Sequence, residues 1–170
     1  MKMDFYFILM ILVVAVAWDL RSLRIPNAIT APAALAGIGY HVTTAGLPGL
    51  KSSVLGLLLG LAILLIPFLL GGLGGGDVKL LAALGAWLGP RGILFAALYG
   101  GLAGGLLALG VMVATGEGAF KFMKTIYDDV VYFVSFGERP PLAERGKRRI
   151  PYSLAIAAGT LGFIFLGPPA

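Results

Sequence analysis

Apolar residues dominate this chain in six long runs, which are separated by short polar or glycine-rich breaks. The runs cover residues 4–19, 27–45, 52–70, 78–89, 92–115 and 151–166. Several are shorter than the about 20 residues that a helix needs to cross a bilayer, so we expect tilted helices, local thinning or polar ends drawn inward. The pattern predicts an all-α membrane protein with about six transmembrane helices.

The composition supports this interpretation. Of the 170 residues, 59% are hydrophobic and only 12% are charged, and the mean hydropathy is +0.96. These values lie outside the range of soluble domains. Because the apolar runs recur from end to end, we expect residues 1–170 to form a single membrane-embedded domain. Residues 5–17 imitate a signal peptide, but Asp4 is unusual in the basic part of one, so we expect a retained first helix.

The basic residues predict the orientation of the bundle. If six helices cross, the connections alternate between the two sides, and one side receives most of the lysines and arginines. This side holds Arg21, Arg24, Lys79, Lys121, Lys124, Arg139, Arg145, Lys147, Arg148 and Arg149, whereas the other holds Lys2, Lys51 and Arg91. Basic loops stay in the cytoplasm, so we expect both termini outside. The basic residues form no continuous stripe, so the net charge of +5 does not predict a nucleic-acid partner.

The long connection between the last two runs, residues 116–150, is expected to be a cytoplasmic basic loop. Within it, residues 120–136 have apolar positions on one side and polar positions on the other. The apolar positions are Phe122, Met123, Ile126, Tyr127, Val130, Val131 and Val134. This spacing predicts an amphipathic helix on the inner membrane surface. It would pack on the bundle or help to receive a membrane-borne partner.

Glycine occurs in two distinct patterns. Small-xxx-small spacing, which lets helices approach closely, is found at Gly56/Gly60, Gly85/Gly89, Gly100/Gly104 and Gly101/Gly105. Residues 71–76 are different, because five of these six residues are glycine. Such a stretch does not hold a stable helix, and irregular backbone at membrane depth is tolerated only inside protein or beside a wet cavity. We therefore expect the backbone to unwind directly before Asp77.

Helix length places two acids at the membrane boundary. Residues 5–18 cover about 21 Å of a ~30 Å hydrocarbon core, so Asp4 or Asp19 lies near its edge. Residues 78–89 cover about 18 Å, which puts Asp77 below the inner surface. An ionisable group at this depth is kept mostly where it faces a polar cavity or a partner.

Two simpler interpretations compete with a catalytic one. Asp77 has the position of a helix N-cap, although a cap does not explain the preceding glycines. Asp19 is also compatible with a boundary acid balanced by Arg21 and Arg24. However, two carboxylates on one side of the membrane are the minimal equipment of an aspartyl protease. Their mutual repulsion keeps one protonated while the other activates water. We therefore take Asp19 and Asp77 as the candidate catalytic residues.

Three motifs resemble those of one family. Residues 74–77 (GGGD) match the GxGD signature of intramembrane aspartyl proteases, and with residues 78–80 (VKL) they resemble the GxGDxK stretch of type IV prepilin peptidases. Asp19 followed by residues 24–27 (RIPN) is similar to the other catalytic segment of that family. Residues 150–153 (IPYS) resemble its C-terminal segment, with a serine where a glycine is common.

The resemblance implies a cytoplasmic-membrane endopeptidase that removes the short leader from prepilins or pseudopilins at the cytoplasmic face, with no cofactor. Larger members also methylate the new N-terminus, and they carry a soluble, cysteine-containing insertion near the N-terminus. Here only residues 20–26 separate the first two helices, and the chain has no cysteine. The chain is therefore more similar to small members that serve Flp-type pili, or to preflagellin peptidases, and we expect no methyltransferase activity.

The same motifs suggest supporting residues for substrate or site, namely Gly74, Gly76, Lys79 and Asn27. For Lys79 the alternatives are contact with the second carboxylate, a substrate acid or a lipid phosphate, and anchoring at the interface. Asn27 would cap the second helix or position Asp19. His41 lies toward the outer end of that helix, and a lone histidine without cysteines or a neighbouring acid is a poor metal site.

A small channel or proton-coupled carrier is the alternative from another class. It would also use an unwound glycine segment and membrane-level carboxylates. Against it, the sequence has no convincing inverted repeat, and its acids gather on one side. The sequence leaves open which aspartate is base and which is acid, the exact substrate, and the oligomeric state.

Overall fold

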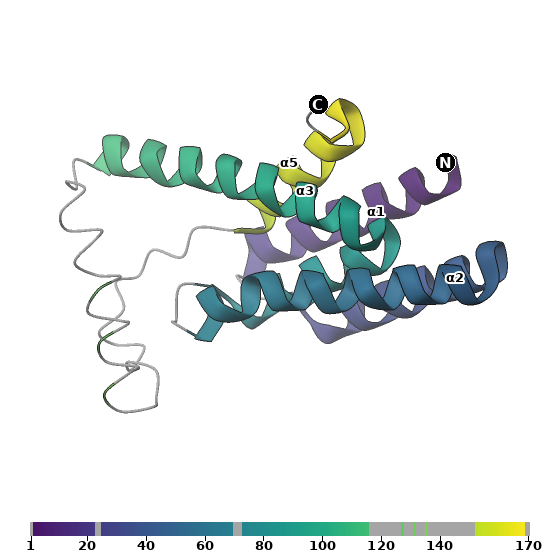
Figure 1. Cartoon of the computed structure of the whole chain (residues 1–170). Coiled ribbons are helices and arrows are strands. Elements are labelled where there is room, and N and C mark those ends of the chain that lie inside the picture. The colour runs from purple at the N-terminus through teal and green to yellow at the C-terminus, as the bar shows by residue number, and fades with distance from the viewer. Residues whose placement is uncertain are drawn as a thin grey trace.

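The computed structural model describes residues 2–22, 25–69, 73–115 and 152–168, together with the isolated positions 127, 131 and 135. In this part of the chain the regular secondary structure is α-helical. Its helices are α1 (Lys2–Ser22), α2 (Asn27–Leu69), α3 (Gly75–Thr115) and α5 (Tyr152–Leu166). Figure 1 shows them packed as a bundle, with α5 crossing close to α1 and α3. The prediction of an all-α fold is confirmed.

Helix α2 turns back on itself at Gly46. Its backbone there has φ 60° and ψ −139°, a conformation that glycine adopts at little cost. Gly49 consequently lies against the carbonyl oxygen of His41, although a straight helix would separate these residues by about 12 Å. The two arms, residues 27–45 and 47–69, lie side by side (Figure 1). The reversal comes directly after the predicted end of the second apolar run, but the link to the third run is itself helical.

Helix α3 also reverses, at Gly89, where φ is 68° and ψ is 179°. Pro90 follows and starts the second arm, a position that suits its fixed φ and missing N–H. Leu81 and Ala96 line one small cavity, whereas about 22 Å would separate them in a straight helix. The predicted break near residue 90 is therefore a reversal at a single glycine.

Among the described residues, three helices are long and apolar enough to cross a membrane: Asp4–Ser22, Asn27–Leu69 and Gly75–Gly110. Helix α5 is apolar but shorter. The reversals at Gly46 and Gly89 divide α2 and α3 into two arms each. Six crossings therefore require that α1, α5 and each of these four arms span the bilayer separately. This stays a prediction, as does the location of the termini.

The first arm of α3 lies at the centre of the bundle, and its Leu80, Leu81 and Leu84 are almost fully buried. Both arms of α2 bond to it. Ser53 Oγ donates to the Ala86 carbonyl at 2.7 Å, and Trp87 Nε1 donates to the Ala33 carbonyl at 2.8 Å. The second arm of α3 packs on α5. These contacts hold the first turn of α5 against the rest of the bundle.

Glycine packing agrees with the prediction at most positions. The backbones of Gly56 and Gly85 touch, Gly60 lies against Leu81, and Gly100 packs on Ala155 of α5. The prediction is wrong for Gly101 and Gly105, because a Cβ at either position would meet nothing within 4 Å. Those two glycines lie on the face of the second α3 arm that turns away from α5.

The predicted amphipathic helix at residues 120–136 lies mostly outside the described residues, as does the basic loop after it. Tyr127, Val131 and Ser135 are described, and each is helical. The side chains of Tyr127 and Val131 are 68% and 42% exposed. Four-residue spacing puts them on one side of a helix, but the packing of that helix on the bundle stays a prediction.

Candidate active site

Asp19 lies in the last turn of α1, and its side chain is only 6% exposed. The hydroxyl of Ser153 donates a hydrogen bond of 2.6 Å to Asp19 Oδ2. Ser153 is fully buried and stands 134 positions later in the chain, in the first turn of α5. The end of α1 therefore meets the beginning of α5 through the candidate acid.

Asp77 is the third residue of α3, and its side chain is 9% exposed. The Gly74 N–H donates to Asp77 Oδ2 at 3.2 Å, and the Asp77 N–H donates to the Gly74 carbonyl at 3.2 Å. A side chain that reaches back in this way from the third helical position is half of a capping box. Asp77 is thus not the N-cap residue of the simpler interpretation, although its carboxylate does satisfy an N–H at the helix start.

The glycine stretch unwinds less than the sequence suggests. Helix α3 begins at Gly75, so Gly75 and Gly76 are helical. Leu73 and Gly74 are not helical, and residues 70–72 lie outside the described part. The expected start at Val78 is wrong because Asp77 caps the helix from inside its first turn and so stabilises two glycines that would otherwise fray.

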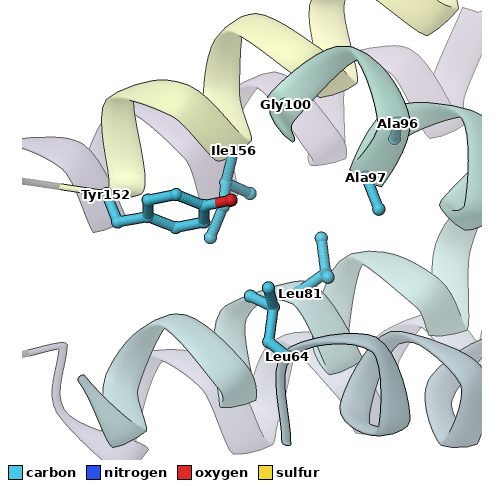
Figure 2. Close-up of a pocket in the computed structure, with 7 residues that line it drawn as sticks. All are labelled: Leu64, Leu81, Ala96, Ala97, Gly100, Tyr152 and Ile156. Carbon is cyan, nitrogen blue, oxygen red and sulfur yellow. The ribbon is translucent and has the colours of Figure 1, made fainter. Parts of the chain in front are cut away.

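Tyr152 lies next to Ser153 in the chain, within electrostatic reach of Asp77. The first turn of α5 therefore bonds to Asp19 through Ser153 and carries Tyr152 within electrostatic reach of Asp77. In Figure 2 the Tyr152 ring borders a cavity whose other lining residues are all apolar: Leu64, Leu81, Ala96, Ala97, Gly100 and Ile156. The cavity measures about 10 Å³, space for about one water molecule. The helices are therefore closely packed around Tyr152.

Gly76 brings two of the sequence motifs into contact. A Cβ at this position would lie 2.9 Å from the Ile25 nitrogen and 3.2 Å from the Ile25 carbonyl oxygen. Ile25 belongs to the R-I-P-N segment that follows Asp19 and is itself buried. Glycine is needed here because any side chain would push the backbone of that segment away. Arg24 of the same segment lies outside the described residues.

Lys79 and Asn27 form a separate polar pair. The Lys79 ammonium donates to Asn27 Oδ1 at 2.8 Å, and both side chains are exposed. Lys79 is about 200° around the helix from Asp77, so it faces another side of α3. The pair borders an open groove of about 270 Å³, lined also by Thr30, Ala31, Ala34, Leu57, Ala82 and Ala83. Asn27 thus uses its amide oxygen on Lys79, and the hydrogen bond found for Asp19 comes from Ser153 instead.

His41 is remote from Asp77. Its Nε2 lies 2.9 Å from the Trp87 carbonyl oxygen, and Trp87 follows Asp77 by ten positions, about 15 Å along the helix. Within the described residues, no group of three or more His, Cys, Asp or Glu side chains could hold a metal ion.

The sequence analysis missed Ser153 and Tyr152 as site residues. The I-P-Y-S segment was recognisable, and the serine stood out as a departure from the related family. The missing information was spatial, because residues so far apart in the chain are linked only by the packing of α5 on α1 and α3.

The fold and the site define a helical membrane protein in which two buried carboxylates lie beside the first turn of one helix. The chain belongs to the type IV leader peptidase family, whose profile matches residues 6–109. This match contains both Asp19 and Asp77.

Two curated relatives are named prepilin leader peptidase/N-methyltransferase and come from Burkholderia pseudomallei strains 1026b and K96243. Each is 30% identical to this chain over 164 residues, which cover 90% of this chain and 43% of the relative. The chain thus spans less than half the length of these relatives. No solved structure matches it significantly.

Proposed function

We propose that this protein is a membrane aspartyl endopeptidase that removes the leader peptide from type IV prepilin-like substrates, with Asp19 and Asp77 as catalytic residues. The observation that carries the proposal is the position of two buried carboxylates beside the first turn of α5 in a member of the type IV leader peptidase family. The substrates would be Flp-type prepilins, pseudopilins or preflagellins.

Hydrolysis by this pair would need one ionised and one protonated carboxyl. The ionised carboxyl takes a proton from water while the water oxygen bonds to the peptide carbonyl carbon. The protonated carboxyl gives its proton to the carbonyl oxygen. When the intermediate collapses, the first carboxyl returns its proton to the leaving nitrogen and the second regains one from a hydroxyl of the intermediate. The C–N bond breaks, and both carboxyls return to their starting states.

We also propose that the chain does not methylate its product. Its relatives carry a methyltransferase name and are more than twice as long as the matched region. In this chain a short link, residues 23–26, separates α1 from α2, so there is no room between them for a further folded unit. The N-methylation step would then need another enzyme or be absent.

The bilayer arrangement belongs to the same proposal. Six crossing arms, with both termini outside, would put the end of α1 and the beginnings of α3 and α5 at the cytoplasmic face of the inner membrane. The substrate is then a single apolar helix that approaches from the bilayer. In this proposal the hydrogen bond between Lys79 and Asn27 joins α2 to α3 at the membrane interface. The Gly74 N–H holds the carboxylate of Asp77, and Gly76 lets the backbone of Ile25 pack against the start of α3.

The test is cleavage of a prepilin-like substrate by the full chain reconstituted in liposomes. We expect one cut near the cytoplasmic end of the substrate's apolar helix, and mass spectrometry should show a product without an added methyl group. Failure to cut several leader types would contradict the proposal. Proton-coupled transport without cleavage would support the carrier instead.

Gly76→Ala should lower kcat/KM for leader cleavage by about tenfold or more. The added methyl group would collide with the Ile25 backbone, and displacing a catalytic group by about 1 Å can cost up to about a hundredfold in rate. The matched control is Gly75→Ala, whose methyl group would meet only the ring of Phe68, 3.2 Å away. Equal activity of the two variants, with equal melting temperatures in detergent, would show that this contact does not position the site.

A further inference from the structure

The open groove beside Lys79 and Asn27 lies between the two arms of α2 and the first arm of α3. Its volume is about 270 Å³. Its other lining residues are Thr30, Ala31, Ala34, Leu57, Ala82 and Ala83. Apart from the threonine hydroxyl, the side chains of this second set are apolar. The groove therefore combines a polar pair with an apolar wall.

The polar pair marks one end of the groove. Helix α2 begins at Asn27 and α3 begins at Gly75, and the hydrogen bond between Lys79 and Asn27 places the two helix starts side by side. Ala34 lies about 10 Å further along α2 than Asn27, and Ala83 lies about 6 Å further along α3 than Lys79. The groove thus runs from the polar pair along both helices and becomes apolar.

The polar pair presents hydrogen-bond donors and positive charge. Lysine has no acceptor atom, so the Asn27 atom that accepts its bond, at 2.8 Å, is the amide oxygen. The Asn27 NH2 group and the other ammonium N–H groups take no part in this bond and can donate to a ligand. Because asparagine is neutral, the bond does not cancel the charge of Lys79. The starts of α2 and α3 add partial positive charge. A matching ligand carries negative charge and acceptor oxygens, as a phosphate does.

The apolar wall favours a lipid over a free phosphate or a peptide helix. A free phosphate would use the polar end alone, whereas an acyl chain would also make van der Waals contacts along the wall. A helix with its side chains is about 10–12 Å wide, and the groove is smaller than the about 300–1,000 Å³ of pockets that enclose a drug-sized ligand. Lys79 also lies about 200° around α3 from Asp77, so a peptide bound here would lie on another side of α3 from that carboxylate.

We propose that this groove binds one anionic phospholipid, with its phosphate at Lys79 and Asn27. One acyl chain lies along Ala31, Ala34 and Ala83. A zwitterionic phospholipid carries the same phosphate, but Lys79 and the two helix starts would repel its ammonium group. The bound lipid joins α2 to α3 at the membrane surface. This inference does not depend on the proposed peptidase activity.

The test is native mass spectrometry of the full chain in detergent, titrated with dioleoylphosphatidylglycerol or dioleoylphosphatidylcholine. The parent should retain one phosphatidylglycerol, bound about fivefold or more tighter than phosphatidylcholine. Lys79→Gln should weaken phosphatidylglycerol binding about fivefold, the effect of one lysine near an anionic membrane surface, and remove the preference between the lipids. Lys51→Gln is the matched control, because Lys51 is an exposed lysine of α2 outside the groove. It should bind both lipids as the parent does.

Asn27→Asp keeps the link between α2 and α3 but changes its charge. The new carboxylate would pair with the Lys79 ammonium, cancel its charge and, without N–H groups, donate nothing to a phosphate. Phosphatidylglycerol binding should fall at least about fivefold, as in Lys79→Gln. The melting temperature in detergent should stay within a few degrees of the parent's, because an exposed ion pair changes stability little. A folded variant that has lost the lipid separates binding from stability.

Ala31→Leu tests the apolar wall, with Ala36→Leu as its control. Both alanines are exposed on the first arm of α2, but Ala31 lines the groove and Ala36 does not. Ala31→Leu should weaken the binding of both lipids at least about fivefold, because the larger side chain occupies the space of the acyl chain. Ala36→Leu should bind both lipids as the parent does.

Three results would overturn the proposal. Equal phosphatidylglycerol binding by the parent and Lys79→Gln would show that the phosphate does not lie at this pair. Competition by glycerol 3-phosphate as strong as that by the lipid would make the groove a free-phosphate site. Displacement of the lipid by a prepilin-like transmembrane peptide, with weaker binding of that peptide to Lys79→Gln, would make it a substrate site. None of these measurements uses cleavage, so a failure of the peptidase proposal leaves their outcome unchanged.

Discussion

Asp19→Asn and Asp77→Asn should each lower kcat/KM for leader cleavage by at least about a thousandfold. Asparagine keeps the size of aspartate, but it cannot hold the negative charge that activates water or pass on a proton. Removing one member of a catalytic unit commonly costs four or more orders of magnitude, about as much as removing the whole unit. The measurement is single-turnover cleavage in liposomes, and each variant should retain its helical circular dichroism.

Asp4→Asn is the matched control. Asp4 lies on the same helix as Asp19, about 22 Å away along its axis, and it interacts with the hydroxyl of Tyr40 on α2. Its variant should keep activity within about threefold of the parent. If Asp19→Asn or Asp77→Asn behaves like Asp4→Asn, that residue is a boundary charge or a capping group and the dyad does not exist. The double variant should be no worse than either single variant, because the two acids act as one unit.

Gly56→Ala and Gly85→Ala should each strongly destabilise the fold. Each glycine's added methyl group would run into the carbonyl oxygen of the other, so the second arm of α2 and the first arm of α3 would have to separate. Forcing extra methyl groups into a packed core costs about 1–3 kcal/mol, and more where the obstacle is backbone. The free energy of unfolding in mixed detergent micelles measures this effect.

Gly101→Ala and Gly105→Ala are the controls for those substitutions. They lie in the second arm of α3, where an added methyl group meets nothing within 4 Å. Alanine is favoured over glycine in a helix by roughly 0.5–1 kcal/mol, so these variants should be equal to the parent or slightly more stable. A loss of stability at Gly101 or Gly105 as large as that at Gly56 would contradict the packing described for the two arms.

Much of the architecture follows from short-range physics that the sequence carries. Apolar runs must form helices in a membrane because every backbone N–H and carbonyl has to be satisfied internally. The runs at residues 27–45 and 78–89 end where Gly46 and Gly89 reverse the chain, and glycine is the residue that adopts such a backbone freely. The candidate acids could be found in the same way. A carboxylate at the end of an apolar helix that is short for a bilayer must lie near the membrane boundary.

The tertiary structure alone decided how the site is assembled. Nothing in the local sequence indicates that Ser153 donates to Asp19, that Tyr152 stands near Asp77, or that Gly76 abuts the backbone of Ile25. Nor does the sequence distinguish Gly100, which packs on α5, from Gly101, which meets nothing. Helical periodicity indicates which residues share one face of a helix. Which neighbouring helix packs on that face depends on the packing of all helices together. For that reason the sequence indicates both candidate acids, whereas their neighbours are found only where α1, α3 and α5 meet.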